Sequence, residues 1–119
     1  KQETESVRNF IDTPNWTSKN NKMMWELYLR DLEESIPCYA APYHAEDLSN
    51  LPETYLEVSE FDPLRDEGLN YARRLKDSGN NIIINSTKGT IHLSSLVITS
   101  ELVKNNLSKI NKKIARSII

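Results

Sequence analysis

The chain has one cysteine, Cys38, and three glycines among its 119 residues. A single cysteine cannot form an internal disulfide, and no Cys/His spacing fits a zinc site. A small scaffold stabilised by disulfides or by zinc is therefore excluded. This cysteine usage leads us to expect a reducing, cytoplasmic location. No apolar run approaches the roughly 18 residues that a bilayer-spanning helix needs. The sequence therefore predicts no membrane span and no bound metal.

The sequence also has no large excess of positive or of negative charge. Fifteen Lys and Arg residues face 17 Asp and Glu residues, which gives a net charge of -2. Phosphate binding needs a concentrated basic surface, so we expect no nucleic acid partner. The chain is 38% hydrophobic and 27% charged, which is typical of an ordinary soluble protein, and its length allows at most one domain.

An amphipathic helix is predicted near residues 18–31, with Ser18 as its N-cap. Its apolar positions recur every three or four residues at Met24, Trp25, Tyr28, Leu29 and Leu32. Trp25, Tyr28, Met23 and Met24 could form a substrate wall, but such a stripe is more often core, so we expect these four side chains to be buried. Residues 1–36 are expected to form a helical region that either connects to the rest of the fold or lies next to a segment that covers the site.

A βαβ unit is predicted in the middle of the chain, which makes the fold class α/β. Parallel strands are expected near 54–58 and 82–85, joined by a helix near 64–78. Gly79 follows that helix and suits a left-handed C-cap. After the second strand we expect a loop that contains Thr87 to Gly89, and then a helix near 93–110.

Two polar side chains, Asp62 and His92, follow the two predicted strands. Neighbouring parallel strands end at the same edge of a sheet, and ligands of open α/β sheets bind at that edge. We therefore expect the two side chains to meet. A carboxylate that holds one nitrogen of an imidazole leaves the other nitrogen free to take a proton from a serine hydroxyl.

A purely structural explanation exists for each residue. Asp62 stands before Pro63 and taken alone favours a helix cap, and a histidine before a helix is more often a cap than a base. Ser94 and Ser95 are likewise expected to cap the helix that follows them. His44 has no such partner and is interpreted as structural. Only the expected pairing of Asp62 with His92 across the βαβ unit favours a catalytic role over these structural roles.

Several segments together resemble the hormone-sensitive-lipase-like α/β hydrolases, which include acetyl esterases and related carboxylesterases. The segments are Ala45 to Pro52, Glu60 to Gly68 with its Asp-Pro-Leu-Arg-Asp-Glu-Gly motif, Tyr71 to Leu75, and Gly89 to His92. The resemblance covers most of residues 23–98. It implies that Asp62 is the acid of a catalytic triad and His92 its base, that the substrate is a small ester, and that no cofactor is needed.

The sequence departs from this family in two ways. Members usually follow the histidine with glycine and an aromatic residue, whereas Leu93 and Ser94 stand here. The Gly-x-Ser-x-Gly turn that carries the nucleophile is absent, and the three glycines cannot form the His-Gly-Gly oxyanion segment either. We therefore expect residues 1–119 to be a C-terminal fragment of a single hydrolase domain, inactive alone.

Three interpretations stay open. The first is a carboxylic ester hydrolase to which this chain contributes the acid and the base. The second is a non-catalytic α/β binding or interaction module that has lost its site. The third is a serine peptidase or thioesterase on the same fold. A two-stranded sheet leaves edges unpaired, so association with an N-terminal part or with a second copy is also expected.

Overall fold

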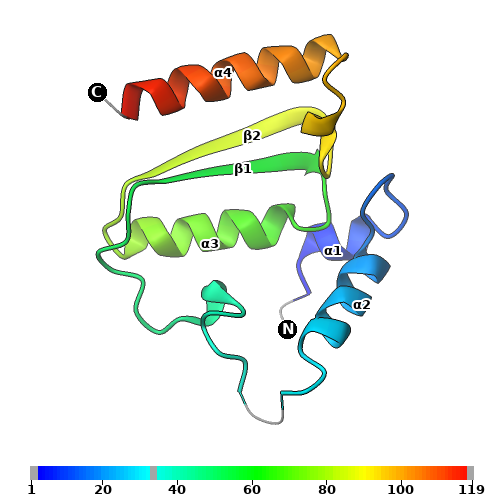
Figure 1. Ribbon diagram of the computed structural model, residues 1–119. Coiled ribbons are helices and arrows are strands. Elements are labelled where there is room, and N and C mark those ends of the chain that lie inside the picture. The colour runs from blue at the N-terminus through cyan, green and yellow to red at the C-terminus, as the bar shows by residue number, and fades with distance from the viewer. Residues whose placement is uncertain (1–2, 33–34, 118–119) are drawn as a thin grey trace.

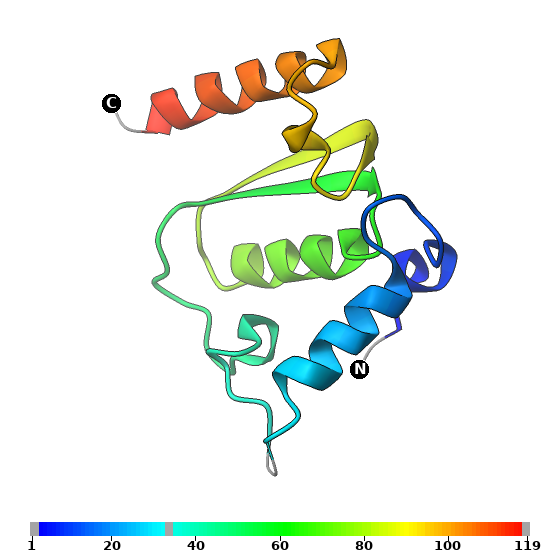
Figure 2. The ribbon, with the colours of Figure 1, turned by 45° about the vertical axis from the view of Figure 1, so that its right-hand side comes forward.

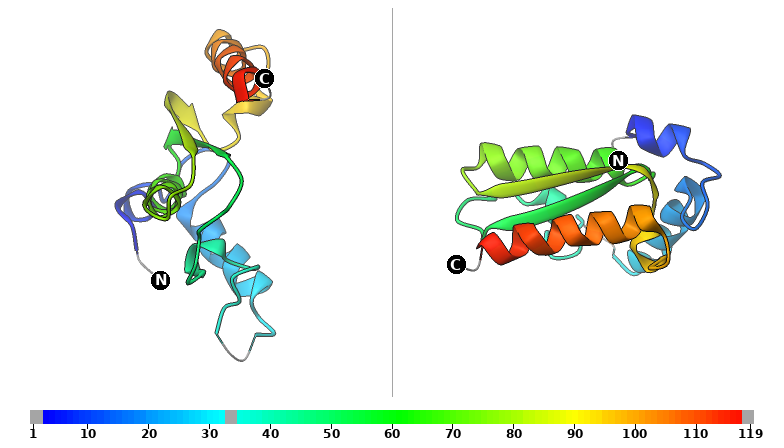
Figure 3. Two further views of the ribbon diagram at one scale, coloured as in Figure 1. Left: turned by 90° about the vertical axis from the view of Figure 1, so that its left-hand side faces the viewer. Right: turned by 90° about the horizontal axis from the view of Figure 1, so that it is seen from above.

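The computed structural model describes residues 3–32 and 35–117, and its centre is a pair of parallel strands. The central elements are β1 (Thr54–Phe61), α3 (Arg65–Asp77) and β2 (Ile82–Ile91). The predicted α/β class and βαβ unit are confirmed. The strand pair lies between α3 and the last helix, α4 (Glu101–Ser117), in the view of Figure 1 and in the end view of Figure 3.

Close contact between α3 and β1 forms the core. A Cβ atom on Gly68 would lie only 3.0 Å from Cγ1 of Val58, so glycine lets the helix approach the strand this closely. Ala72 and Leu75 continue the same helix face and are completely buried. The helix ends as predicted, because Gly79 follows it with a φ of 85°.

Both strands extend further than the sequence indicated, β1 to Phe61 and β2 to Ile91. The expected loop around Thr87 is part of β2, where Thr87 pairs with Ser59 of β1 and its hydroxyl also donates to the carbonyl of Val58 at 3.1 Å. Ser59 lies opposite Thr87, yet Phe61 lies opposite Ile91, so the register shifts between these pairs. This irregularity lets a polar, glycine-containing stretch remain paired.

The helix predicted near 93–110 is wrong in its first part. A single 3₁₀ turn, η2 (Ser94–Leu96), follows β2, and α4 begins only at Glu101. Residues 97–99 are β-branched and lose side-chain freedom in a helix, which favours a break there. Neither α4 nor any other helix within residues 3–32 and 35–117 is long and apolar enough to cross a membrane.

Two further helices, α1 (Glu5–Asn9) and α2 (Ser18–Tyr28), lie near the start of α3, at the edge where both strands end (Figure 2). The predicted N-cap is wrong by one residue. The Thr17 side chain accepts from the N–H of Asn20 at 3.1 Å, whereas Ser18 donates to the carbonyl of Phe10 at 3.0 Å. Ser18 therefore ties α2 back to the segment that follows α1.

The apolar stripe of α2 is less buried than expected. Met23 is 55% exposed and Tyr28 60% exposed, and only Met24 and Trp25 are half-buried. The interpretation of this stripe as core is wrong for Met23 and Tyr28, because helical spacing defines a face without saying what covers it. Residues 1, 2, 33 and 34 of the predicted 1–36 region lie outside the described residues.

Candidate active site

Asp62 follows the last residue of β1, and its side chain is buried at the carboxyl edge of the sheet. Its two carboxylate oxygens have separate partners. Oδ1 accepts a hydrogen bond from the N–H of Leu64 at 2.8 Å, which turns the chain into α3. Oδ2 lies 2.8 Å from Nδ1 of His92. The capping contact and the imidazole contact, which looked like alternatives in the sequence, thus use different atoms of one carboxylate.

His92 is the first residue after β2, and its side chain is 24% exposed. A carboxylate only accepts hydrogen bonds, so the 2.8 Å contact with Asp62 assigns a proton to Nδ1, which donates to Oδ2. This tautomer leaves Nε2 as the nitrogen that can accept a proton from another group. The two side chains predicted to meet therefore do so, and the imidazole presents a basic atom.

A hollow of about 280 Å³ opens beside this pair. Among the residues that line it are Asp62, His92, Leu56, Val58, Leu93, Ser94 and Ser95. The predicted capping role of the two serines is wrong, because η2 has no side-chain cap and begins at Ser94 itself. Both serines instead belong to the residues that line the hollow beside His92.

Leu93 has a φ of 58°, in the left-handed region that favours glycine. A leucine in this conformation costs roughly 1–2 kcal/mol, because its Cβ crowds the backbone. The family's usual glycine at this place therefore has a physical reason. The chain must turn sharply after His92 so that the imidazole faces Asp62.

We expect Leu93→Gly to be more stable than Leu93→Ala by about 1 kcal/mol, because both lose the side chain but only glycine relieves the backbone strain. This reverses the usual order, in which alanine is preferred to glycine. Urea unfolding midpoints of the two variants measure the difference. An alanine variant at least as stable as the glycine variant would contradict the assigned strain.

Two residues that the sequence analysis did not single out also contact His92. The Asn15 side chain donates to the carbonyl of His92 at 2.7 Å, and the ring centroid of Trp16 lies 5.6 Å from that of the imidazole. Pro14 before Asn15 does predict a turn, but nothing in the sequence says what a turn 77 residues away will touch.

Comparisons with known proteins identify the family of this fold. The family described as "alpha/beta hydrolase fold" matches residues 1–95. The chain belongs to this alpha/beta hydrolase family. It is 40% identical over 67 residues to an arylesterase of Saccharolobus solfataricus, a match that covers 56% of this chain and 22% of the arylesterase. It is 44% identical over 55 residues to arylacetamide deacetylase of Bos taurus, which covers 44% and 14% respectively.

Solved structures give the same result over more of the chain. A bacterial heroin esterase superimposes with a TM-score of 0.80 at 41% identity, covering 90% of this chain and 35% of the esterase. The resemblance to hormone-sensitive-lipase-like esterases is confirmed by these matches. The matched parts of this alpha/beta hydrolase chain span between about a seventh and about a third of the lengths of the three proteins named here.

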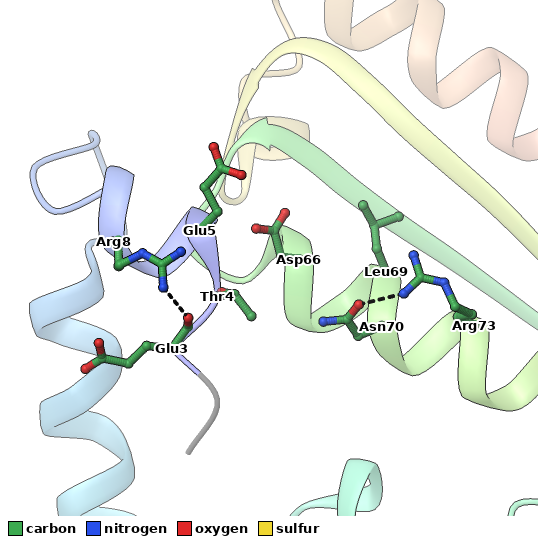
Figure 4. A pocket seen from close by; sticks show the side chains of 8 residues that line it. All are labelled: Glu3, Thr4, Glu5, Arg8, Asp66, Leu69, Asn70 and Arg73. Atoms are coloured by element: carbon green, nitrogen blue, oxygen red, sulfur yellow. Dashed lines mark hydrogen bonds between the residues drawn. The ribbon is translucent and has the colours of Figure 1, made fainter.

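The second aspartate of the hydrolase motif, Asp66, has a structural task. Its Oδ2 accepts from the N–H of Ser6 at 2.7 Å and its Oδ1 accepts from Nε of Arg65 at 2.9 Å. Burial alone would raise the pKa of Asp66, but the hydrogen bonds from Ser6 and Arg65 outweigh it and lower that pKa below its usual value. Figure 4 shows Asp66 on the first turn of α3, close to α1.

Ser6 completes this connection from the other side. It is fully buried, donates to the carbonyl of Pro63 at 2.9 Å and accepts from the N–H of Asp66 at 3.2 Å. The N-terminal segment thereby holds the turn that presents Asp62. No local pattern predicts that a serine 57 residues upstream of Pro63 is part of this turn.

We expect Ser6→Ala to lower the free energy of unfolding by about 1–3 kcal/mol, because the Pro63 carbonyl and the Asp66 N–H lose a buried partner. Urea unfolding measures this loss. Ser95→Ala, at an exposed serine, is the matched control and should change stability by less than about 0.5 kcal/mol. Equal midpoints for the two variants would contradict the role of Ser6.

Among the described residues, no serine hydrogen-bonds to the imidazole of His92. The sequence also contains no Gly-x-Ser-x-Gly turn. His44, at the end of η1 (Pro42–His44), is exposed and meets the ring of Tyr43 edge-on. The hydrolase chain therefore supplies one carboxylate and imidazole pair, but no serine in a nucleophile turn.

Proposed function

We propose that this chain belongs to a carboxylic ester hydrolase in which Asp62 is the acid and His92 the base of a catalytic triad. The observation that carries the proposal is the 2.8 Å contact between Oδ2 of Asp62 and Nδ1 of His92 at the carboxyl edge of the sheet. The esterases among its relatives and structural neighbours support the substrate class. The nucleophile is proposed to be a serine from outside these 119 residues.

The reaction proceeds in two halves. Nε2 of His92 takes the proton from the serine hydroxyl as its oxygen attacks the ester carbonyl, and Asp62 stabilises the resulting imidazolium. His92 then gives this proton to the alcohol oxygen as the C–O bond breaks, which leaves an acyl-enzyme. Water repeats the sequence, and its attack on the acyl carbon releases the acid and restores the serine.

The 119-residue chain alone lacks the nucleophile and the oxyanion donors of this scheme. Each of these parts contributes orders of magnitude to the rate. The isolated chain should therefore be inactive towards esters. The triad is completed only in a protein that adds the remaining parts at the edge where β1 and β2 end.

The test uses the product of the complete reading frame and short p-nitrophenyl esters. Hydrolysis, together with covalent labelling of one serine by a fluorophosphonate probe, is the expected result, and the isolated chain is expected to show neither. Peptide anilides and thioesters assayed in parallel test the other hydrolase classes on this fold. A folded product that neither labels nor hydrolyses any of these substrates would instead be a non-catalytic module.

A further inference from the structure

The turn formed by Thr13 to Trp16 reaches the imidazole from outside the βαβ unit. Within it, the Thr13 hydroxyl donates to the carbonyl of Trp16 at 2.7 Å, and the N–H of Trp16 donates to the carbonyl of Pro14 at 3.0 Å. Asn15 has a φ of 75°, a conformation that asparagine tolerates better than most residues. These hydrogen bonds stabilise the turn independently of its contacts with the site.

Two contacts join this turn to His92. Nδ2 of Asn15 donates to the backbone carbonyl of His92 at 2.7 Å. The indole of Trp16 lies against the imidazole, with 5.6 Å between ring centroids and 30° between ring planes. One contact holds the backbone, and the other places the tilted indole beside the imidazole ring.

The conformation after His92 explains why such support matters. Leu93 is held in the left-handed region, and the strain favours a different local backbone. The contact with Asp62 restrains only Nδ1, so coupled changes in the two side-chain torsions of His92 can still tilt the ring plane. A flat side chain against the ring face removes this remaining freedom.

We propose that Trp16, assisted by Asn15, is a positioning residue for His92, which rests on the proposed function of His92 as the base. Neither side chain needs to touch the reacting atoms. Trp16 holds the imidazole plane so that Nε2 faces the serine, and Asn15 holds the His92 backbone against the strain at Leu93. A displacement of about 1 Å at such a base can cost on the order of a hundredfold in rate.

The indole itself supplies a matched control. Nε1 of Trp16 is buried and has no hydrogen-bond partner among the described residues, so Trp16→Phe keeps an aromatic face and loses no bond seen there. Trp16→Ala removes the face altogether. For Asn15, glycine is the suitable replacement, because it removes the amide and accepts a positive φ.

The experiment measures kcat and KM for p-nitrophenyl acetate in the product of the complete reading frame. We expect Trp16→Ala to lower kcat on the order of ten- to a hundredfold with KM changed less than threefold, and Trp16→Phe to restore kcat to within about threefold. Asn15→Gly should lower kcat about threefold, since its hydrogen bond is exposed. A raised KM with unchanged kcat in Trp16→Ala would make Trp16 a substrate wall and overturn the proposal.

A second readout does not depend on activity. These 119 residues contain two histidines, so they contribute few ring signals to the NMR spectra of ¹³C-histidine-labelled protein. The signals that disappear in His92→Ala are those of His92. Ring protons of His92 should shift in Trp16→Ala, because they leave the indole face, and should shift less in Trp16→Phe. Unchanged signals in Trp16→Ala would overturn the proposal. A wild-type protein without hydrolase activity would contradict the proposed function instead, and the shifts would still test the contact.

Discussion

Replacing His92 by alanine is expected to lower the hydrolysis of p-nitrophenyl acetate by at least about a hundredfold while the protein stays folded. The imidazole is the group proposed to remove the serine proton and to protonate the leaving alcohol, and no other described histidine lies at the site. The side chain is 24% exposed, so its removal creates no deep cavity. The rate is measured as kcat/KM, and folding is checked by the urea unfolding midpoint.

His44→Ala is the matched control for this variant. His44 is the other histidine of the chain, lies in η1, and contacts the ring of Tyr43. It is exposed, so its replacement should change neither stability nor kcat/KM appreciably. Undiminished turnover in His92→Ala, or an equal loss in His44→Ala, would contradict the assignment of the base.

Local sequence patterns were sufficient to predict the centre of the fold. The strands predicted near 54–58 and 82–85 and the helix predicted near 64–78 each correspond to an element of the structure. Parallel pairing then places Asp62 and His92 at one edge by topology alone. The candidate pair was predictable because each residue stands in the connection that follows a predicted strand.

The remaining features depend on contacts between distant segments, which local patterns do not describe. Thr87 lies in a strand because it pairs with Ser59, a residue 28 positions earlier in the chain. Ser6 and Trp16 belong to the site because α1 and the turn after it pack against the start of α3 and the end of β2. Exposure of Met23 was likewise not predictable, because periodicity does not identify what covers a helix face.

Replacing Asp62 by asparagine is expected to lower kcat on the order of 10²- to 10⁴-fold. Oδ1 of the asparagine can still accept from the N–H of Leu64, so the turn into α3 is kept. Its amide nitrogen, however, replaces Oδ2 opposite Nδ1 of His92 and donates where the carboxylate accepted. The imidazole must then hold its proton on Nε2, and the nitrogen that faces the serine can no longer act as a base.

A double-variant comparison separates this mechanism from a simple loss of stability. If Asp62 acts only through His92, the protein with both Asp62→Asn and His92→Ala should be no slower than His92→Ala alone, because residues that act as a unit are not additive. The three variants are compared at saturating p-nitrophenyl acetate, with unfolding midpoints measured in parallel. Multiplicative losses in the double variant would mean that Asp62 serves the reaction by a route other than the imidazole, and that the 2.8 Å contact is structural.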